Sequence, residues 1–301
     1  MPDIPAEGTI MKQKTKTQLI KSVAVTGLLF TSVTILSKKK YPDSVYYSNP
    51  EQKNPFEGEK VIFIEDSNDK ENADGERGHL EAIGLVEIKT SIYQQYVKRG
   101  IDIVLSFGGL VLLSPVLGAI ALAIKMDDPG PILFTQKRVG RNKRYFKLHK
   151  FRSMKMSTPH DVPTHMLDDP EQYITKVGKF IRAHSLDELP QIWDIFIGNM
   201  SVIGPRPALW NQDKLTALRD EYGVNETTPG LTGWAQINGR DELGLSEKAK
   251  YDGEYARIIR KGGIHALLMD CKCFIGTILS AAKGEGVVEG RTRELKNKET
   301  I

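Results

Sequence analysis

The sequence predicts an α+β protein, mostly helical, with a membrane-embedded re-entrant helix followed by a compact cytoplasmic domain that carries interfacial amphipathic helices. Three observations favour this fold class. An apolar stretch over 103–124 is interrupted at its middle by Ser114-Pro115, and basic residues flank both of its ends. After Asp127 the chain has the frequent Gly and Pro of soluble sequence. Near its C-terminal end, apolar residues recur at helical spacing.

Charge and hydropathy divide the 301 residues into five regions. They are a basic N-terminus with a short apolar stretch (1–37), a polar linker-like region (38–90), the broken membrane helix (91–126), a compact domain (127–290) and a polar tail (291–301). As a helix, the apolar stretch over 22–37 would span about 24 Å, less than the ~30 Å of a bilayer core. It is either a thin membrane anchor or a core helix. The linker-like region shows only one short strand, KVIFI.

The apolar stretch over 103–124 must bend at Ser114-Pro115, because proline removes a backbone hydrogen bond and clashes with the carbonyl four residues earlier. We expect Ser114 to help satisfy the freed group. Lys98 and Arg99 precede the stretch and a basic run over 137–152 follows it, so both ends favour the cytoplasmic face. Each arm of roughly 16 Å matches one leaflet. A re-entrant helix satisfies these charges, whereas a kinked spanning helix is the ordinary alternative.

The net charge of the chain is +4, and Lys and Arg are most crowded in the basic run over 137–152. Such a run is usually a solvated face, but its position after an apolar segment favours anionic lipid or phosphate as a partner. Cys271 and Cys273 have no second Cys/His pair at zinc spacing, which indicates neither a disulfide framework nor a metal site. We expect both to be reduced, buried thiols.

The segment HSLDELPQIW places Asp187 and Glu188 side by side. Ser185 followed by Glu188 has the spacing of a capping box, in which the two side chains satisfy backbone N–H groups at a helix start. The acids are therefore either a helix cap or a catalytic pair. A cap would also aim backbone N–H groups at a bound phosphate, so the two interpretations are compatible.

Four further stretches are rich in Gly, Pro and basic residues: GPILFTQKRVG with FKLHKFRSMK, IRAHSLDELPQIW, GNMSVIGPRP and PGLTGWAQINGRDE. Each by itself is explained equally well by a turn with a structural arginine. Taken in order after KRGIDIVL and the Ser-Pro break, the series closely resembles the bacterial sugar transferases that are monotopic phosphoglycosyl transferases. The resemblance covers roughly residues 93–290.

The resemblance implies transfer of a sugar-1-phosphate from a UDP-sugar to polyprenyl (undecaprenyl) phosphate, giving a polyprenyl-diphosphate sugar and UMP. It implies a first membrane step of exopolysaccharide, capsule or glycoconjugate assembly, in a bacterial cell membrane with the catalytic domain facing the cytoplasm. The partners are then the UDP-sugar, the polyprenyl phosphate and anionic lipid of the cytoplasmic leaflet, with no nucleic acid. A homo-oligomer stays open.

By the same resemblance, Asp187 is the nucleophile, and Asp187 and Glu188 bind Mg²⁺, which offsets the charge of the substrates' phosphates. Arginine suits phosphate because its planar fork binds two oxygens. The expected substrate-binding residues are Lys150, Arg152, Arg182, Arg206, Gln236, Asn238 and Arg240. Alternatively, some of these cations pair structurally with acids, and the GWAQ segment packs a turn.

Three residues depart from the family pattern. Asn199 stands where an acid is usual, Thr228 where a base is usual, and Asp194 where Asn is frequent. They motivate one alternative, a non-catalytic membrane-attached scaffold. The other alternative keeps the substrates but makes Asp187 a general base in a direct, ternary-complex transfer.

The C-terminal stretches over 248–261 and 265–283 have apolar residues at helical spacing. On the second, one side carries Leu267, Leu268, Cys271, Phe274, Ile275 and Ile278. This side either packs in the core or lies along the membrane interface.

Overall fold

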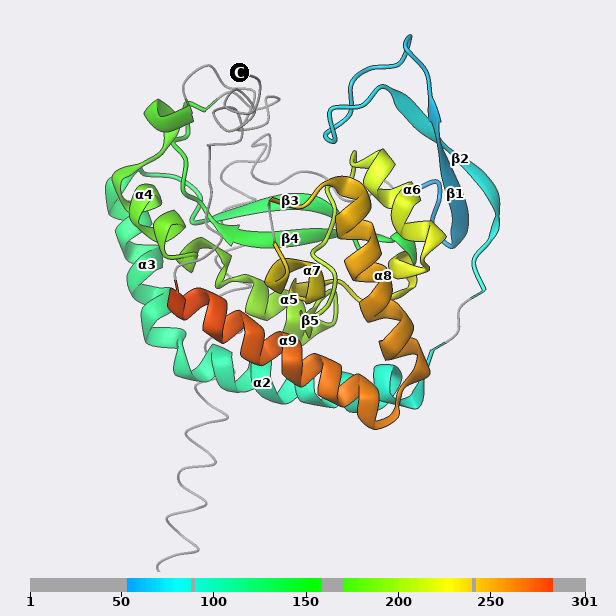
Figure 1. Ribbon diagram of the computed structural model, residues 1–301. Coiled ribbons are helices and arrows are strands. Elements are labelled where there is room, and N and C mark those ends of the chain that lie inside the picture. The colour runs from blue at the N-terminus through cyan, green and yellow to red at the C-terminus, as the bar shows by residue number, and fades with distance from the viewer. Residues whose placement is uncertain (1–52, 88–89, 159–169, 240–241, 284–301) are drawn as a thin grey trace, which may run out of the picture.

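The computed structural model describes residues 53–87, 90–158, 170–239 and 242–283 (Figure 1). Predictions for 1–37, the tail over 291–301 and Arg240 lie outside the described residues. The helices are α2 (Lys98–Leu112), α3 (Ser114–Asp127), α4 (Lys176–Ala183), α5 (Gln191–Ile197), α6 (Asp213–Glu221), α7 (Trp234–Ile237), α8 (Leu245–Lys261) and α9 (Gly263–Lys283). Short helical turns are η1 (Tyr93–Val97), η2 (Arg141–Lys143), η4 (Pro170–Tyr173), η5 (Leu186–Glu188) and η6 (Val224–Glu226).

Small two-stranded sheets lie among the helices of this described part, which confirms the predicted α+β class. The strands are β1 (Glu59–Glu65), β2 (Gly78–Leu85), β3 (Leu133–Val139), β4 (Tyr145–Phe151), β5 (Ser201–Ile203) and β6 (Gly230–Thr232). β1–β2 and β3–β4 are antiparallel hairpins, and β5–β6 is parallel. Figure 1 shows β3–β4 at the centre of the molecule, with α5 below it and α3 and α4 beside one end. The basic run over 137–152 is therefore a central hairpin.

The apolar stretch forms two helices, α2 and α3, that meet at an angle of 59° between Leu112 and Ser114. Pro115 deprives the carbonyl of Val111 of its usual partner, and the Ser114 hydroxyl donates to that carbonyl at 2.8 Å. This confirms the predicted bend and the role of Ser114 in it. Leu112 is 79 % exposed. The bent pair and α9 are the described segments long and apolar enough to cross a membrane.

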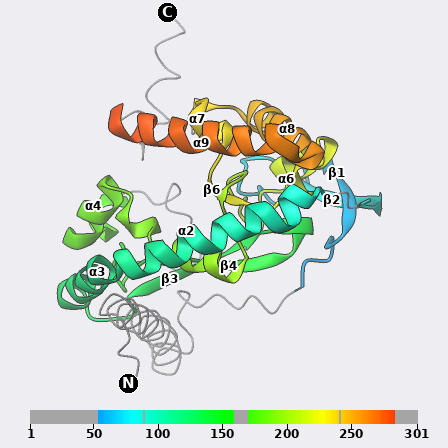
Figure 2. The same ribbon diagram turned by 90° about the horizontal axis from the view of Figure 1, so that it is seen from below.

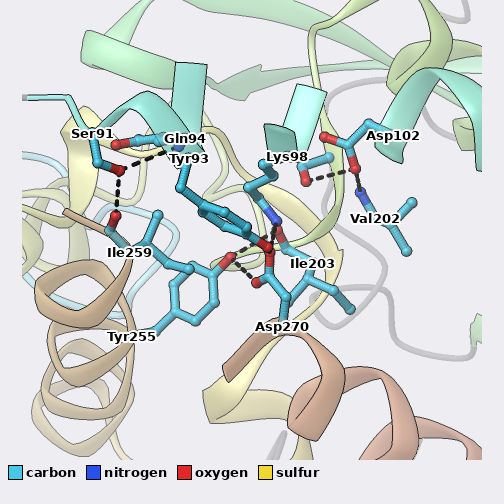
Figure 3. Close-up of polar contacts among 11 residues, drawn as sticks. Ser91, Tyr93, Gln94, Lys98, Asp102, Val202, Ile203, Tyr255, Ile259 and Asp270 are labelled. Atoms are coloured by element: carbon cyan, nitrogen blue, oxygen red, sulfur yellow. Dashed lines mark hydrogen bonds and ion pairs between the residues drawn. The ribbon is translucent and has the colours of Figure 1, made fainter. Parts of the chain in front are cut away.

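A buried polar cluster joins the start of α2 to α8 and α9 (Figure 3). The Asp270 carboxylate accepts hydrogen bonds from Lys98 at 2.7 Å and from the hydroxyls of Tyr93 and Tyr255, both at 2.8 Å. Tyr255 also donates to the backbone carbonyl of Ile203 at 3.1 Å. Because all four polar side chains are buried, this cluster holds the start of α2 and the helix α9 in a fixed orientation relative to each other (Figure 2).

The predicted helices over 248–261 and 265–283 are confirmed as α8 and α9. The face of α9 in the core carries Ala266, Met269 and Cys273. The side predicted to be either core or interface is mostly exposed, since Leu268, Phe274, Ile275 and Ile278 are 44–57 % accessible and only Leu267 packs against the core. Core packing is therefore the wrong interpretation for this side. Cys273 is buried as expected, but Cys271 is exposed.

Part of the linker-like region 38–90 folds as a hairpin that packs on α6. The expected strand KVIFI lies in β1, and β2 pairs with it. The hairpin holds both ends of α6, because Val61 N donates to Asp220 Oδ2 at 2.8 Å and Leu215 N donates to Asp74 Oδ2 at 3.1 Å. The region is thus more ordered than its composition indicates.

Candidate functional site

Asp187 and Glu188 lie on η5, a single 3-10 turn between α4 and α5. Ser185 precedes it in the left-handed conformation, with φ 54°, which costs a non-glycine residue about 1–2 kcal/mol. Its side chain makes no capping hydrogen bond. The Glu188 carboxylate binds Lys150 and Arg206 instead of backbone N–H groups. The predicted capping box is therefore wrong, because Glu188 is held by cations from distant parts of the chain.

Two cations from different elements meet at Glu188. Lys150 Nζ, from β4, lies 2.8 Å from Glu188 Oε1 and 4.0 Å from Asp187 Oδ2. Arg206, from the loop after β5, donates one guanidinium nitrogen to each Glu188 oxygen. Burial would raise the pKa of Glu188, but the charges of Arg206 and Lys150 outweigh it and hold that pKa well below its usual range. Glu188 is therefore ionised, and it holds two cations, of which Lys150 also reaches Asp187.

Arg138 belongs to the same charged region, although the sequence interpretation gave it no role. Its guanidinium donates to Gln136 and to the Pro207 carbonyl, at 2.9 Å for the latter. Burial and the positive charge of Arg206 lower the pKa of Arg138 to about 9, although the negative charge of Glu188 acts to raise it. The feature of the sequence that could have indicated a role for Arg138 is its position in the KRVG motif. Nothing in that motif indicates that Arg138 packs beside the GPRP loop.

The other cations that were predicted to bind substrate lie in different parts of the structure. Arg152 is 1 % exposed, and its guanidinium is held by Asp128 and the Pro131 carbonyl. These contacts hold the loop after α3 in place. Lys143, in the same basic run, is fully buried against Asp220. A solvated face is therefore the wrong interpretation for these two side chains. Arg182 lies in the last turn of α4, which packs against η5.

The GWAQ segment forms the short helix α7, which packs on α8 and α9. The Trp234 indole donates to Glu254 at 3.0 Å, and the Asn238 amide donates to the Trp234 carbonyl at 2.7 Å. Gln236 Oε1 is buried without a hydrogen-bond partner in the described part of the chain. Trp234 and Asn238 thus make structural contacts here, and Gln236 retains an unused acceptor.

Two of the three family departures contact one another. Asp194 is fully buried, binds the His149 ring at 2.8 Å, and accepts a hydrogen bond from the side chain of Asn199. Burial raises the pKa of Asp194, and the bonds from His149 and Asn199 lower it. Two of the positions that depart from the family pattern are therefore neighbours in the structure, where an acid and an amide contact each other.

Fold and site together define a class of protein in which bent apolar helices adjoin paired carboxylates and converging cations, an arrangement suited to phosphate groups. The family model described as bacterial sugar transferase matches residues 93–284. The chain belongs to the bacterial sugar transferase family, and this confirms the family predicted from the motifs.

Relatives of known name match the same part of the chain. The UDP-glucose:undecaprenyl-phosphate glucose-1-phosphate transferase of Escherichia coli K12 is 42% identical over 190 residues, covering 60% of this chain and 40% of the relative. The undecaprenyl-phosphate glucose phosphotransferase of Komagataeibacter xylinus is 39% identical over 170 residues, covering 53% and 32%. The exopolysaccharide production protein PSS of Rhizobium leguminosarum is 35% identical over 199 residues, covering 63% and 98%. The chain thus spans less than half of the first two relatives and nearly all of the third.

Proposed function

We propose that this protein transfers a sugar-1-phosphate from a UDP-sugar to undecaprenyl phosphate, producing a polyprenyl-diphosphate sugar and UMP. The names of its relatives support this substrate class. The observation that carries the proposal is the site itself, where Lys150 reaches both Asp187 and Glu188. It places a carboxylate beside cations that match the phosphates of donor and acceptor.

In the first step, a carboxylate oxygen of Asp187 attacks the sugar-linked phosphorus of the UDP-sugar. The bond from that phosphorus to the bridging oxygen breaks, and UMP leaves with the electron pair. In the second step, a phosphate oxygen of the lipid attacks the same phosphorus and the Asp187 carboxylate departs. One diphosphate linkage replaces another, so no ATP is needed. Covalent catalysis of this kind divides one difficult transfer into two easier ones.

The residues have complementary roles in this scheme. Lys150 and Arg206 neutralise phosphate oxygens as UMP leaves, and Glu188 keeps both cations in place before the substrate arrives. Asp187 is partly buried, with a side chain 14% exposed. Removal of water there strengthens its interactions with the phosphates. Arg138 supports the Arg206 loop through the Pro207 carbonyl.

Mg²⁺ fits this site only in part. The described residues contain no group of three or more acidic, His or Cys side chains that would hold a metal ion by themselves. Both Glu188 oxygens face cations, so Glu188 joins a metal only by releasing one of them. We propose that Asp187 and the substrate phosphates hold the ion, as is usual for Mg²⁺. When bound, it would supply positive charge to the phosphate oxygens.

The deciding experiment gives purified protein a UDP-sugar without lipid acceptor. The covalent scheme predicts UMP release of about one equivalent per protein and a phosphosugar trapped on Asp187, detected by mass spectrometry of the intact protein. UMP that appears only after undecaprenyl phosphate is added would favour the direct, ternary-complex transfer instead. A panel of UDP-sugars in the same assay identifies the donor.

We also propose that α2 and α3 form a re-entrant helix and that the exposed side of α9 lies along the membrane surface. The 59° bend and the basic residues at both ends support this topology. Single cysteines replacing Tyr96 and Met126, which are exposed at either end of the helix pair, test it in a Cys271→Ser background. An impermeant maleimide should label both from the cytoplasmic side. Labelling from opposite sides would show that the pair spans the membrane.

A further inference from the structure

A cavity of about 180 Å³ lies at the start of α2, between η1, the end of α5, α8 and the turn at Thr228. None of the residues that line it belongs to the cluster around Glu188, so it is separate from the proposed active site. It has far more room than the ~10–15 Å³ that one water needs. Thr228 lines this space with a short side chain.

The lining is rich in hydrogen-bond donors. The cations that line it are Lys98, Arg99 and Arg141, against the carboxylate of Asp102. Lys98 is paired with Asp270 (Figure 3). Arg99 donates to the carbonyls of Ile195 and Phe196 at the end of α5, and no carboxylate neutralises it in the described structure.

Arg141 is the cation with the most unused hydrogen-bonding capacity. Its Nε donates to the Glu226 carbonyl at 3.0 Å, while neither terminal nitrogen has a partner among the described residues. The Glu226 carboxylate interacts electrostatically with both Arg141 and Arg260, and it lies 3.5 Å from Arg260. The Gln94 amide and the Thr228 hydroxyl, which line the same cavity, likewise have no partner within the described chain. Donors that line one polar cavity can bind the oxygens of a tetrahedral anion.

The surroundings of the cavity indicate where such an anion would come from. Ile92, Tyr96 and Val97 are 77 %, 65 % and 46 % exposed and belong to the same turn as Gln94 and Gln95. Tyrosine and apolar residues next to basic ones are typical of the membrane–water interface, where basic pockets bind lipid head groups. Asp102 accepts from Ser201 Oγ and Val202 N, so part of its charge is already compensated.

We propose that this cavity is a second binding site, which takes a phosphate group through Arg141, Gln94 and Thr228. The phosphate belongs to the head group of an anionic phospholipid or is free in solution. The lipid source rests on the proposed membrane function, whereas binding of phosphate itself does not. A bound head group would anchor the start of α2 without taking part in sugar transfer.

The test measures the unfolding temperature of detergent-purified Asp187→Asn protein as inorganic phosphate is added, with UMP present to fill the nucleotide site. We expect a saturable rise. Arg141→Gln should increase the half-saturating phosphate concentration at least tenfold. Arg144→Gln makes the same change of charge at an exposed position in the same turn, and it should change that concentration less than twofold.

Thr228→Leu provides the sharper variant, because it fills the cavity and leaves every charge in place. It too should weaken phosphate binding at least tenfold. An unchanged affinity in this variant, an equal effect of Arg144→Gln, or no saturable rise in the parent protein would overturn the proposal.

The source of the phosphate is found by repeating the titration in nanodiscs. If an anionic head group occupies the cavity, the phosphate response disappears in phosphatidylglycerol discs and persists in phosphatidylcholine discs. A response that persists in both identifies free phosphate as the ligand. Both results support the cavity site, and neither depends on sugar transfer.

Discussion

The cluster around Glu188 and the cluster around Asp270 use the same ion-pair chemistry for different ends. In each cluster a carboxylate accepts a hydrogen bond from a lysine, with N–O distances of 2.8 Å for Lys150 and 2.7 Å for Lys98. Asp270 is completed by two tyrosine hydroxyls from neighbouring elements, and its lysine is 8% exposed. At the other cluster Lys150 is 19% exposed and is shared with a second acid, Asp187. The carboxylate of Asp270 has its hydrogen-bond partners within the protein, so that cluster holds helices together. The lysine shared by Asp187 and Glu188 is available to bind a substrate.

The largest expected effect is the loss of activity when the acid that shares Lys150 is replaced. Asp187→Asn removes the nucleophile, so UMP release and lipid-linked sugar should both fall at least about 1,000-fold. The unfolding midpoint in urea should hardly change, because Asn keeps the size of the side chain. Retained turnover in this variant would show that Asp187 is not the nucleophile.

Asp270→Ala should have the opposite profile. It leaves Lys98 buried without its partner, and loss of one member of a buried ion pair costs about 3–5 kcal/mol. Urea unfolding should show this loss of stability, and any fall in activity should follow the folded fraction. Asp270→Asn is the control, since its amide oxygen can still accept from one of the two tyrosines and less stability should be lost. A destabilisation below about 1 kcal/mol for Asp270→Ala would contradict the assigned role.

Arg206→Lys sharpens the comparison within the proposed active site. Lysine keeps the charge but loses the planar fork that binds both Glu188 oxygens and matches phosphate. We expect kcat/KM for the UDP-sugar to fall about 10–100-fold, or about 1.4–2.7 kcal/mol, with little change in stability. Arg182→Lys is a matched control on α4. A larger loss there than at Arg206 would move the phosphate contact to Arg182.

The smallest expected effect concerns pH. Because the pKa of Glu188 is lowered in the folded protein, its ion pairs contribute stability above the unfolded value near 4.3 and lose it as the pH falls through the folded value. Glu188→Gln should therefore lower stability by about 1 kcal/mol at pH 7. The difference from the parent protein should shrink below pH ~4. Urea unfolding at pH 7, 5 and 3 measures it, and a difference that grows on acidification would have the wrong sign.

Several features followed from sequence because their causes are local. The bend at Ser114-Pro115 arises from the missing N–H of one proline, and the helical spacing over 248–283 gave α8 and α9. The ordered motifs identify the family without any knowledge of side-chain positions. The hairpin over 59–85 was only half predicted, since its β1 strand is regular but its β2 strand is mostly exposed and has a glycine near each end, which weakens the strand signal.

What the sequence determined by itself is the broken helix, the C-terminal helices, the family and the Asp187–Glu188 pair. Tertiary structure decided which cations reach that pair, because Lys150 is 38 residues from Glu188 and Arg206 is 18 residues away. It also buried Arg152 against Asp128 and exposed the apolar side of α9. The physical reason is that dihedral preferences and periodicity act over a few residues. Ion pairs and burial depend on how distant segments pack, and charge alone does not specify that.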